Sequence, residues 1–181
     1  PRDMARECTD EPVVVVGPHR LPDRLLPIDS RYDDLHLMVK VLAKLGARVT
    51  PFLPNRINEG YGFGRKGLER CLGGTEPVQL IITVDCGTNA VETLEFAASR
   101  NVDVVVTDHH EVAGPTEPAV AVVNPKLGKD PAVEALAGVG VAFKVCHGLI
   151  KDGITSARPE VSGVDIRDYL DIVATGTVAD L

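Results

Sequence analysis

Two apolar segments of the chain end in residue types that bind metal ions. The run VDVVVT is followed at once by Asp108, His109 and His110, and the run LIITV is followed by Asp85. A fifth candidate, Asp180, falls at the far end of a predicted helix. In open α/β sheets ligands bind beyond the carboxyl ends of the strands. If the two runs are neighbouring strands, these side chains predict a metal site at that edge.

The mixture of carboxylates and imidazoles indicates which ions such a site would bind. Neutral imidazole together with carboxylate suits Mn, Fe, Co or Zn better than Mg or Ca, which prefer shells made only of oxygen. A carboxylate between two cations can bridge them, and ions roughly 3.5–4 Å apart can clamp both oxygens of a phosphoryl displacement. One histidine would then be available for a phosphate, and Asp108 could orient an imidazole.

The elements that must position these residues alternate between strand and helix. We predict strands at 12–16, 47–53, 79–84, 102–106 and 119–123. We predict helices at 33–45, from the glycine-rich loop 54–64 to about 72, from Thr88-Asn89 through 97, at 135–150 and at 165–180. This alternation predicts an α/β fold with a doubly wound, mainly parallel sheet of about five strands. Residues 1–181 are expected to form a single domain, with 1–11 as a frayed lead-in.

Composition is compatible with this fold and limits the class of protein. The 181 residues are 44% hydrophobic and 25% charged, with no Trp and 4% aromatic residues, so the core must be aliphatic. A net charge of −7 argues against a broadly basic nucleic-acid-binding surface but allows a local cationic groove. Four scattered cysteines favour a reducing cytoplasm, and no run approaches the roughly 18 apolar residues of a membrane span. We therefore expect a cytoplasmic protein without membrane contact.

Several short motifs occur in a fixed order along the chain. They are PNR at 54–56, EGYG at 59–62, VDCG at 84–87, TDHH at 107–110, NPK at 124–126, LAGVG at 136–140 and GTVAD at 176–180. In this order and spacing they resemble the DHH phosphoesterase superfamily, and most nearly its RecJ-type single-stranded-DNA-specific exonucleases. The resemblance covers about residues 47–181.

The resemblance implies a function and a role for each site residue. It implies a metal-dependent phosphodiesterase with two Mn²⁺ or Mg²⁺ ions, a 5′–3′ exonuclease on single-stranded DNA in DNA repair and recombination. Asp85 would bridge the ions, His109 and Asp180 would be ligands, and His110 would contact the scissile phosphate. Arg56 would contact a phosphate or the DNA backbone. Protein partners are not implied.

The segment after the first strand departs from the family pattern. RecJ-like proteins carry an Asp-x-Asp-x-Asp-Gly run there, whereas this chain reads GPHRLPDRL at 17–25. His19 and Asp23 fit the His-x-x-x-Asp pattern of other DHH branches and are candidate ligands, but Leu25 stands where the next aspartate is expected. Three further acids could fold back to substitute: Asp29, Asp33 and Asp34.

This departure leaves two alternatives to the exonuclease. One is a catalytically impaired DHH domain that binds nucleic acid or a protein partner, and the other is a phosphoesterase of small oligonucleotides, which the His19 and Asp23 pattern favours. RecJ-like enzymes continue into a C-terminal substrate-binding domain, and we expect no such domain within residues 1–181. Only Tyr61 and Phe63 are loop aromatics that could stack on bases.

Overall fold

The computed structural model describes residues 13–16, 32–59, 62–75, 77–116, 118–128 and 130–180, without the side chains of 13–16 and of Arg56. The predicted frayed segment 1–11 lies outside the described residues, as do His19, Asp23, Asp29 and Tyr61.

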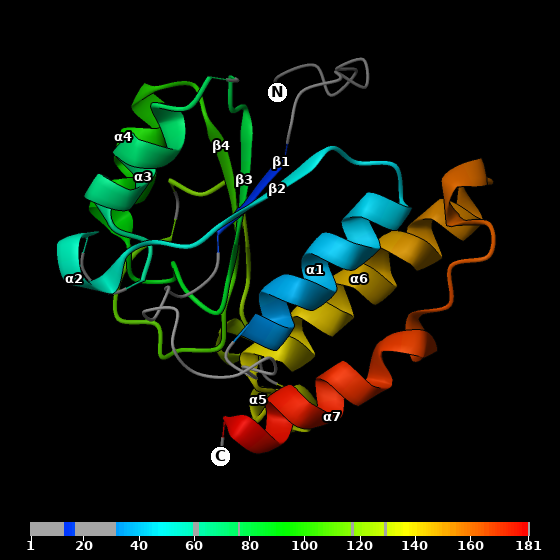
Figure 1. The fold of residues 1–181 in the computed structure, drawn as a ribbon. Helices are drawn as coiled ribbons and strands as arrows, with labels where there is room; N and C mark the ends of the chain where they lie inside the picture. Colours follow the sequence, from blue (N-terminus) through cyan, green and yellow to red (C-terminus); the bar gives the residue numbers. More distant parts are fainter. Residues whose placement is uncertain are drawn as a thin grey trace.

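Five parallel strands form one sheet in the order β2-β1-β3-β4-β5, which confirms the predicted fold class (Figure 1). Their bounds are β1 Val13–Val16, β2 Val49–Phe52, β3 Leu80–Val84, β4 Asp103–Thr107 and β5 Ala121–Val123. The strands β3 and β4 are neighbours, with Val84 opposite Thr107. Because the pair is parallel and in this register, the residues that follow both strands leave the sheet at the same edge.

Helices cover both faces of the sheet, so the fold is doubly wound (Figure 1). On one face lie α1 Asp33–Lys44, α6 Gly138–Thr155 and α7 Leu170–Ala179, and on the other lie α3 Arg65–Leu72 and α4 Val91–Ser99. The short elements are α2 Arg56–Glu59, α5 Pro131–Glu134 and the 3₁₀ turns Pro125–Leu127, Pro159–Val161 and Ile166–Tyr169. None of the helices in the described part of the chain is both long and apolar enough to cross a bilayer.

The apolar character of the central strands follows from burial on both faces. Along β3, Ile82 and Val84 pack in the cluster with α1 and α6, whereas Ile81 packs in the cluster with α3 and α4. Successive side chains of a strand point to opposite faces, so a strand covered on both sides must be apolar throughout. The aliphatic core expected from the composition is therefore confirmed.

Three predicted helix bounds differ from the structure. The helix expected at 135–150 is α6, which begins at Gly138 and continues to Thr155. The separate short helix α5 precedes it, where the Asp130 side chain accepts a bond from the Ala132 amide (3.0 Å). The helix expected from 165 starts with a 3₁₀ turn capped by Asp165. The helix expected from Thr88-Asn89 begins at Val91.

Two glycines of α6 offer a matched test of the packing on its two sides. A Cβ at Gly153 would lie 2.3 Å from Val161 Cγ1, whereas a Cβ at Gly148 would meet nothing within 4 Å. We expect Gly153→Ala to lower the free energy of unfolding by about 1–3 kcal/mol through overpacking. Gly148→Ala should raise it by up to about 1 kcal/mol, because alanine favours a helix interior. Urea denaturation measures both, and equal shifts in the same direction would contradict this packing.

Candidate metal centre

A sharp turn directs the first site residue out of the end of β3. Asp85 has a φ of 56° and Gly87 a φ of 110°, both in the left-handed region. A Cβ on Gly87 would lie 2.9 Å from Thr83 Oγ1, which itself donates to the carbonyl of Cys86 (2.7 Å). A non-glycine residue such as Asp85 holds this conformation at a cost, and such strain is concentrated at functional sites.

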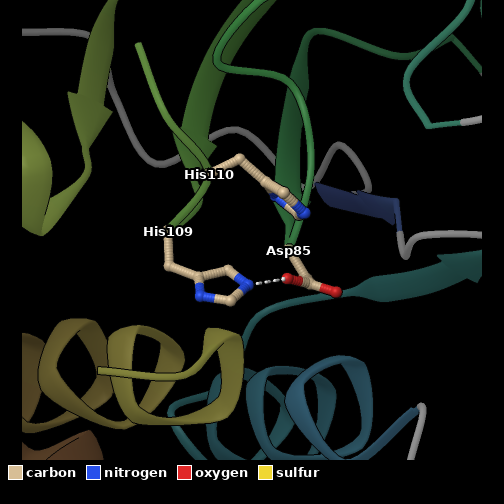
Figure 2. Close-up of side chains that lie close together, drawn as sticks. All are labelled: Asp85, His109 and His110. Atoms are coloured by element: carbon tan, nitrogen blue, oxygen red, sulfur yellow. Dashed lines mark ion pairs between the residues drawn. The ribbon is translucent and has the colours of Figure 1, made fainter. Parts of the chain in front are cut away.

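The ends of β3 and β4 bring together three of the predicted site residues. Donor atoms of Asp85, His109 and His110 all lie within 4.8 Å of one another (Figure 2). His109 Nε2 is 2.9 Å from Asp85 Oδ1, and its Nδ1 is 3.7 Å from Oδ2 of Asp180, the residue that follows α7. His109 therefore lies between the two carboxylates.

The donor atoms at this point fit a divalent ion. Asp85 Oδ1 is buried and accepts no hydrogen bond of acceptable geometry from the described residues, although the His109 ring lies at ion-pair distance. Leaving a buried carboxylate oxygen without a partner is costly, and a cation would satisfy it. Carboxylates combined with imidazole suit Mn²⁺ or Zn²⁺.

The surroundings of His109 favour its protonated form. Contact with the Asp85 carboxylate raises the pKa of His109, with further contributions from the charges of Asp180 and Asp108, while burial opposes the rise. The imidazole therefore holds a proton more tightly than usual in this surrounding. A metal ion would replace that proton, because an imidazole binds metal only in its neutral form.

The first residue of α6 approaches Asp85 closely. A Cβ on Gly138 would lie 2.7 Å from Asp85 Oδ1, so only glycine leaves room for the carboxylate. The approach also places the carboxylate at the N-terminus of the 18-residue helix α6. The LAGVG motif thus has a structural role that the sequence pattern did not reveal.

Asp108 lies behind His110 instead of among the ligands. Its Oδ1 is 2.7 Å from His110 Nδ1, and its Oδ2 accepts the Thr88 amide at 3.0 Å. Burial by itself would raise the pKa of Asp108, but the contacts with His110 and Thr88 hold it below its ordinary value. The side chain of Asp108 is 2% exposed and that of His110 is 46% exposed. A buried carboxylate on one ring nitrogen fixes the tautomer and leaves the other nitrogen facing outward.

Asn124, directly after β5, holds this arrangement from the neighbouring strand. Its Nδ2 donates to Thr88 Oγ1 (3.0 Å) and to the His110 carbonyl (2.9 Å), and its Oδ1 accepts the Lys126 amide (2.9 Å). It is 6% exposed. The NPK motif singled out Asn124 in the sequence. Its hydrogen bonds to Thr88 and His110 are visible only in the folded structure.

The remaining sequence candidates fall outside the cluster or outside the description. Arg56 is the first residue of α2, and its side chain is among those not described. Phe63 is 4% exposed and packs in the core with α3 and α4, so the expectation that it stacks on bases is wrong. The loop carrying it folds back onto the domain, which is why an aromatic there is buried.

A doubly wound parallel sheet with aspartate and histidine side chains beyond two adjacent strands defines a class of α/β domain with a metal centre at its carboxyl edge. Within this class, the model of the DHH family, N-terminal domain, matches residues 35–177, and the chain belongs to this family.

Named relatives and a solved structure agree with this assignment. The chain is 40% identical over 147 residues to the single-stranded-DNA-specific exonuclease RecJ of Bacillus subtilis, covering 80% of this chain and 17% of the relative. It is 40% identical over 146 residues to RecJ of Thermus thermophilus, covering 80% and 20%. A crystal structure of exonuclease RecJ bound to manganese aligns with a TM-score of 0.74 at 30% identity, over 95% of this chain and 39% of that one. The chain thus spans about a fifth of the length of these two relatives.

The approach of α6 to Asp85 is tested by Gly138→Ala. The added methyl group must displace the Asp85 carboxylate, and displaced supporting contacts typically weaken metal affinity by about 10–100-fold. Calorimetric titration with Mn²⁺ should show that loss, while Gly148→Ala, in open space on the same helix, should bind as the parent does. Equal affinity in both variants would mean that Asp85 is not a ligand.

The role of Asn124 is tested against Asn89, which also bonds to the segment after β4 but is exposed. Asn124→Ala leaves buried groups of Thr88 and His110 without a partner and should cost about 1–3 kcal/mol of unfolding free energy. Asn89→Ala should cost less than about 1 kcal/mol because water replaces its bonds. Thermal or urea unfolding gives both values, and a larger loss at Asn89 would refute this ranking.

Proposed function

We propose that this chain is the phosphodiesterase domain of a RecJ-type exonuclease, which hydrolyses single-stranded DNA from its 5′ end with two Mn²⁺ or Mg²⁺ ions. The observation that carries the proposal is the convergence of Asp85, His109 and His110 in a member of the DHH family. Relatives named as single-stranded-DNA-specific exonucleases and a manganese-bound RecJ structure support the substrate and the metal.

In this proposal the site residues divide into metal ligands and substrate-binding residues. Asp85, His109 and Asp180 would hold the ions, and Asp85 would be the ligand common to both. Divalent ions in such a site lower the pKa of a bound water and stabilise charge on a transferring phosphoryl group. His110, whose Nδ1 is held by Asp108, turns its other nitrogen outward, and in the imidazolium form, with both nitrogens protonated, that nitrogen would donate to a phosphate oxygen. Asn124 keeps His110 in place through its backbone carbonyl.

The chain has a net charge of −7, and two of its acids, Asp85 and Asp180, lie at the metal edge beside His109. Bound cations neutralise those acids at the point where the phosphate must arrive. The rest of the DNA strand would be bound by residues beyond this site, such as Arg56, or by segments outside the domain. We therefore expect the domain by itself to bind single-stranded DNA weakly and to hydrolyse it with little processivity.

Asp85→Asn tests the proposal with almost no change of side-chain volume. It should abolish binding of at least one ion and slow hydrolysis of single-stranded DNA by about 100-fold or more, because each 1.4 kcal/mol of lost stabilisation is tenfold in rate. Calorimetry with Mn²⁺ counts the ions, and 5′- and 3′-labelled oligonucleotides report direction. Asp152→Asn, an exposed acid of α6, is the control and should change neither.

Three outcomes of these assays would count against the proposal. Full activity of Asp85→Asn would make the ligand assignment wrong. Faster hydrolysis of a dinucleotide than of a long strand would favour a small-oligonucleotide phosphoesterase. Binding of fewer than two ions by the parent chain, with no hydrolysis, would identify a domain without catalysis of its own.

A further inference from the structure

An ion pair joins the short helix α2 to the helix α3. Both Nε and Nη2 of Arg70 donate to the carboxylate of Glu59, with Nη2 at 3.0 Å from Oε2. The side chain of Glu59 is only 10% exposed, although that of Arg70 is 50% exposed. A two-pronged pair whose carboxylate is mostly shielded from water fixes geometry more firmly than an open surface pair does. Neither residue is among the predicted metal ligands, so the pair has a separate role.

Both side chains of this pair also hold the backbone that leads out of β2. Glu59 Oε2 accepts the Asn55 amide at 2.7 Å, and Arg70 Nη2 donates to the Leu53 carbonyl at 2.9 Å. The guanidinium carbon of Arg70 lies over the Phe52 ring, 4.2 Å from its centroid. Hydrogen bonding to Arg70 lowers the pKa of Glu59 although burial opposes this, so the carboxylate is ionised at neutral pH. The pair therefore determines the path of the chain from the end of β2 to Glu59.

The segment held in this way lies at the same edge of the sheet as the metal centre. Because β2 and β3 are both parallel to β1, the chain leaves both strands at the carboxyl edge. Figure 1 shows α2 beyond the end of β2 and beside α3. Further along, Gly62 lies against the turn that follows β3, since a Cβ on it would be 3.8 Å from Cys86 Cβ. Cys86 directly follows Asp85, so the connection from β2 to α3 contacts the turn that carries a predicted metal ligand.

The fixed segment presents exposed residues to a ligand at this edge. Asn55 is exposed and Ile57 is 84% exposed, and Asn55 Oδ1 accepts the Ile57 amide at 3.0 Å. Between them in the chain is Arg56, the sequence candidate for a phosphate contact. A side chain binds a ligand more tightly when its backbone is already fixed, because less conformational freedom is lost on binding. The ion pair would thus act on DNA binding through Arg56.

We propose that Glu59 and Arg70 are positioning residues, which hold α2 at the metal edge so that Arg56 binds a phosphate of single-stranded DNA. The inference rests on the proposed function, because the ligand is the DNA strand expected at the metal centre. It gives a role to Glu59 in the EGYG motif and to Arg70, which lies outside every motif. The competing explanation is an ion pair that only stabilises the fold. The two explanations differ in whether the effect of Glu59 on DNA binding depends on Arg56.

A double-mutant cycle of Glu59→Gln and Arg56→Ala separates them, with DNA affinity as the readout. The ligand is a 3′-labelled oligothymidylate with phosphorothioate linkages, which resist hydrolysis. Fluorescence anisotropy at low ionic strength with Mg²⁺ gives its Kd for the 181-residue chain. Glu59→Gln should weaken binding about threefold or more in the parent, and no further in Arg56→Ala. The matched control is Glu69→Gln, which breaks the exposed ion pair with Arg65 on α3 and should bind as the parent does.

Two further measurements remove dependence on how well Glu59→Gln folds. Urea unfolding reports the folded fraction of each variant, and Arg70→Lys replaces an unfolded Glu59→Gln in the cycle, because lysine keeps the charge but cannot form the two-pronged pair. On the parent, the oligothymidylate should shift the nuclear magnetic resonance signal of the Asn55 amide. It should leave in place the signal of Ala157, which lies just beyond the far end of α6.

The outcomes distinguish failure of this inference from failure of the proposed function. An unshifted Asn55 amide, parent-like binding by Glu59→Gln, or equal weakening by Glu59→Gln with and without Arg56 would overturn the positioning role and leave the proposed function intact. A parent chain that neither binds the oligothymidylate nor hydrolyses single-stranded DNA would overturn both.

Discussion

The parallel pairing of β3 with β4 is the constraint on which the rest of the site depends. With Val84 opposite Thr107, the chain leaves both strands at the same edge, and the residues that follow them meet. A parallel pair requires a crossover connection, here through α4, and burial of both faces. The aliphatic core that covers the two faces is therefore the condition for bringing Asp85 to His109.

Two features of Asp85, at this edge of the sheet, are unfavourable for stability. Asp85 has a positive φ, and its Oδ1 is buried and accepts no hydrogen bond from the described residues. A buried oxygen of this kind reduces stability in the absence of a cation, and a bound cation would relieve that cost. Metal binding at this site would therefore be linked to folding stability.

Glycines let three backbones approach where a side chain would separate them. Gly138 leaves room for the Asp85 carboxylate, and Gly176 lets α7 contact α6 and the first turn of α1. The second contact places the last turn of α7, and with it Asp180, near His109. Membership of the DHH family through residues 35–177 thus corresponds to a structure in which the motif glycines position the motif acids.

The sequence by itself predicted the fold class, the order of the elements and the meeting of Asp85, His109 and His110 at one edge of the sheet, because strand periodicity and the rule about carboxyl ends are local signals. It could not reveal the close approach of Gly138, the bonds of Asn124 to Thr88 and His110, or the burial of Asp34 and Phe63. These features depend on which segments, distant in the chain, pack against each other. The starts of two short helical elements also differ from the predicted helix bounds, where Asp130 and Asp165 cap them. Tertiary structure decided them, since burial and electrostatic environment are properties of packed neighbours, not of residue type.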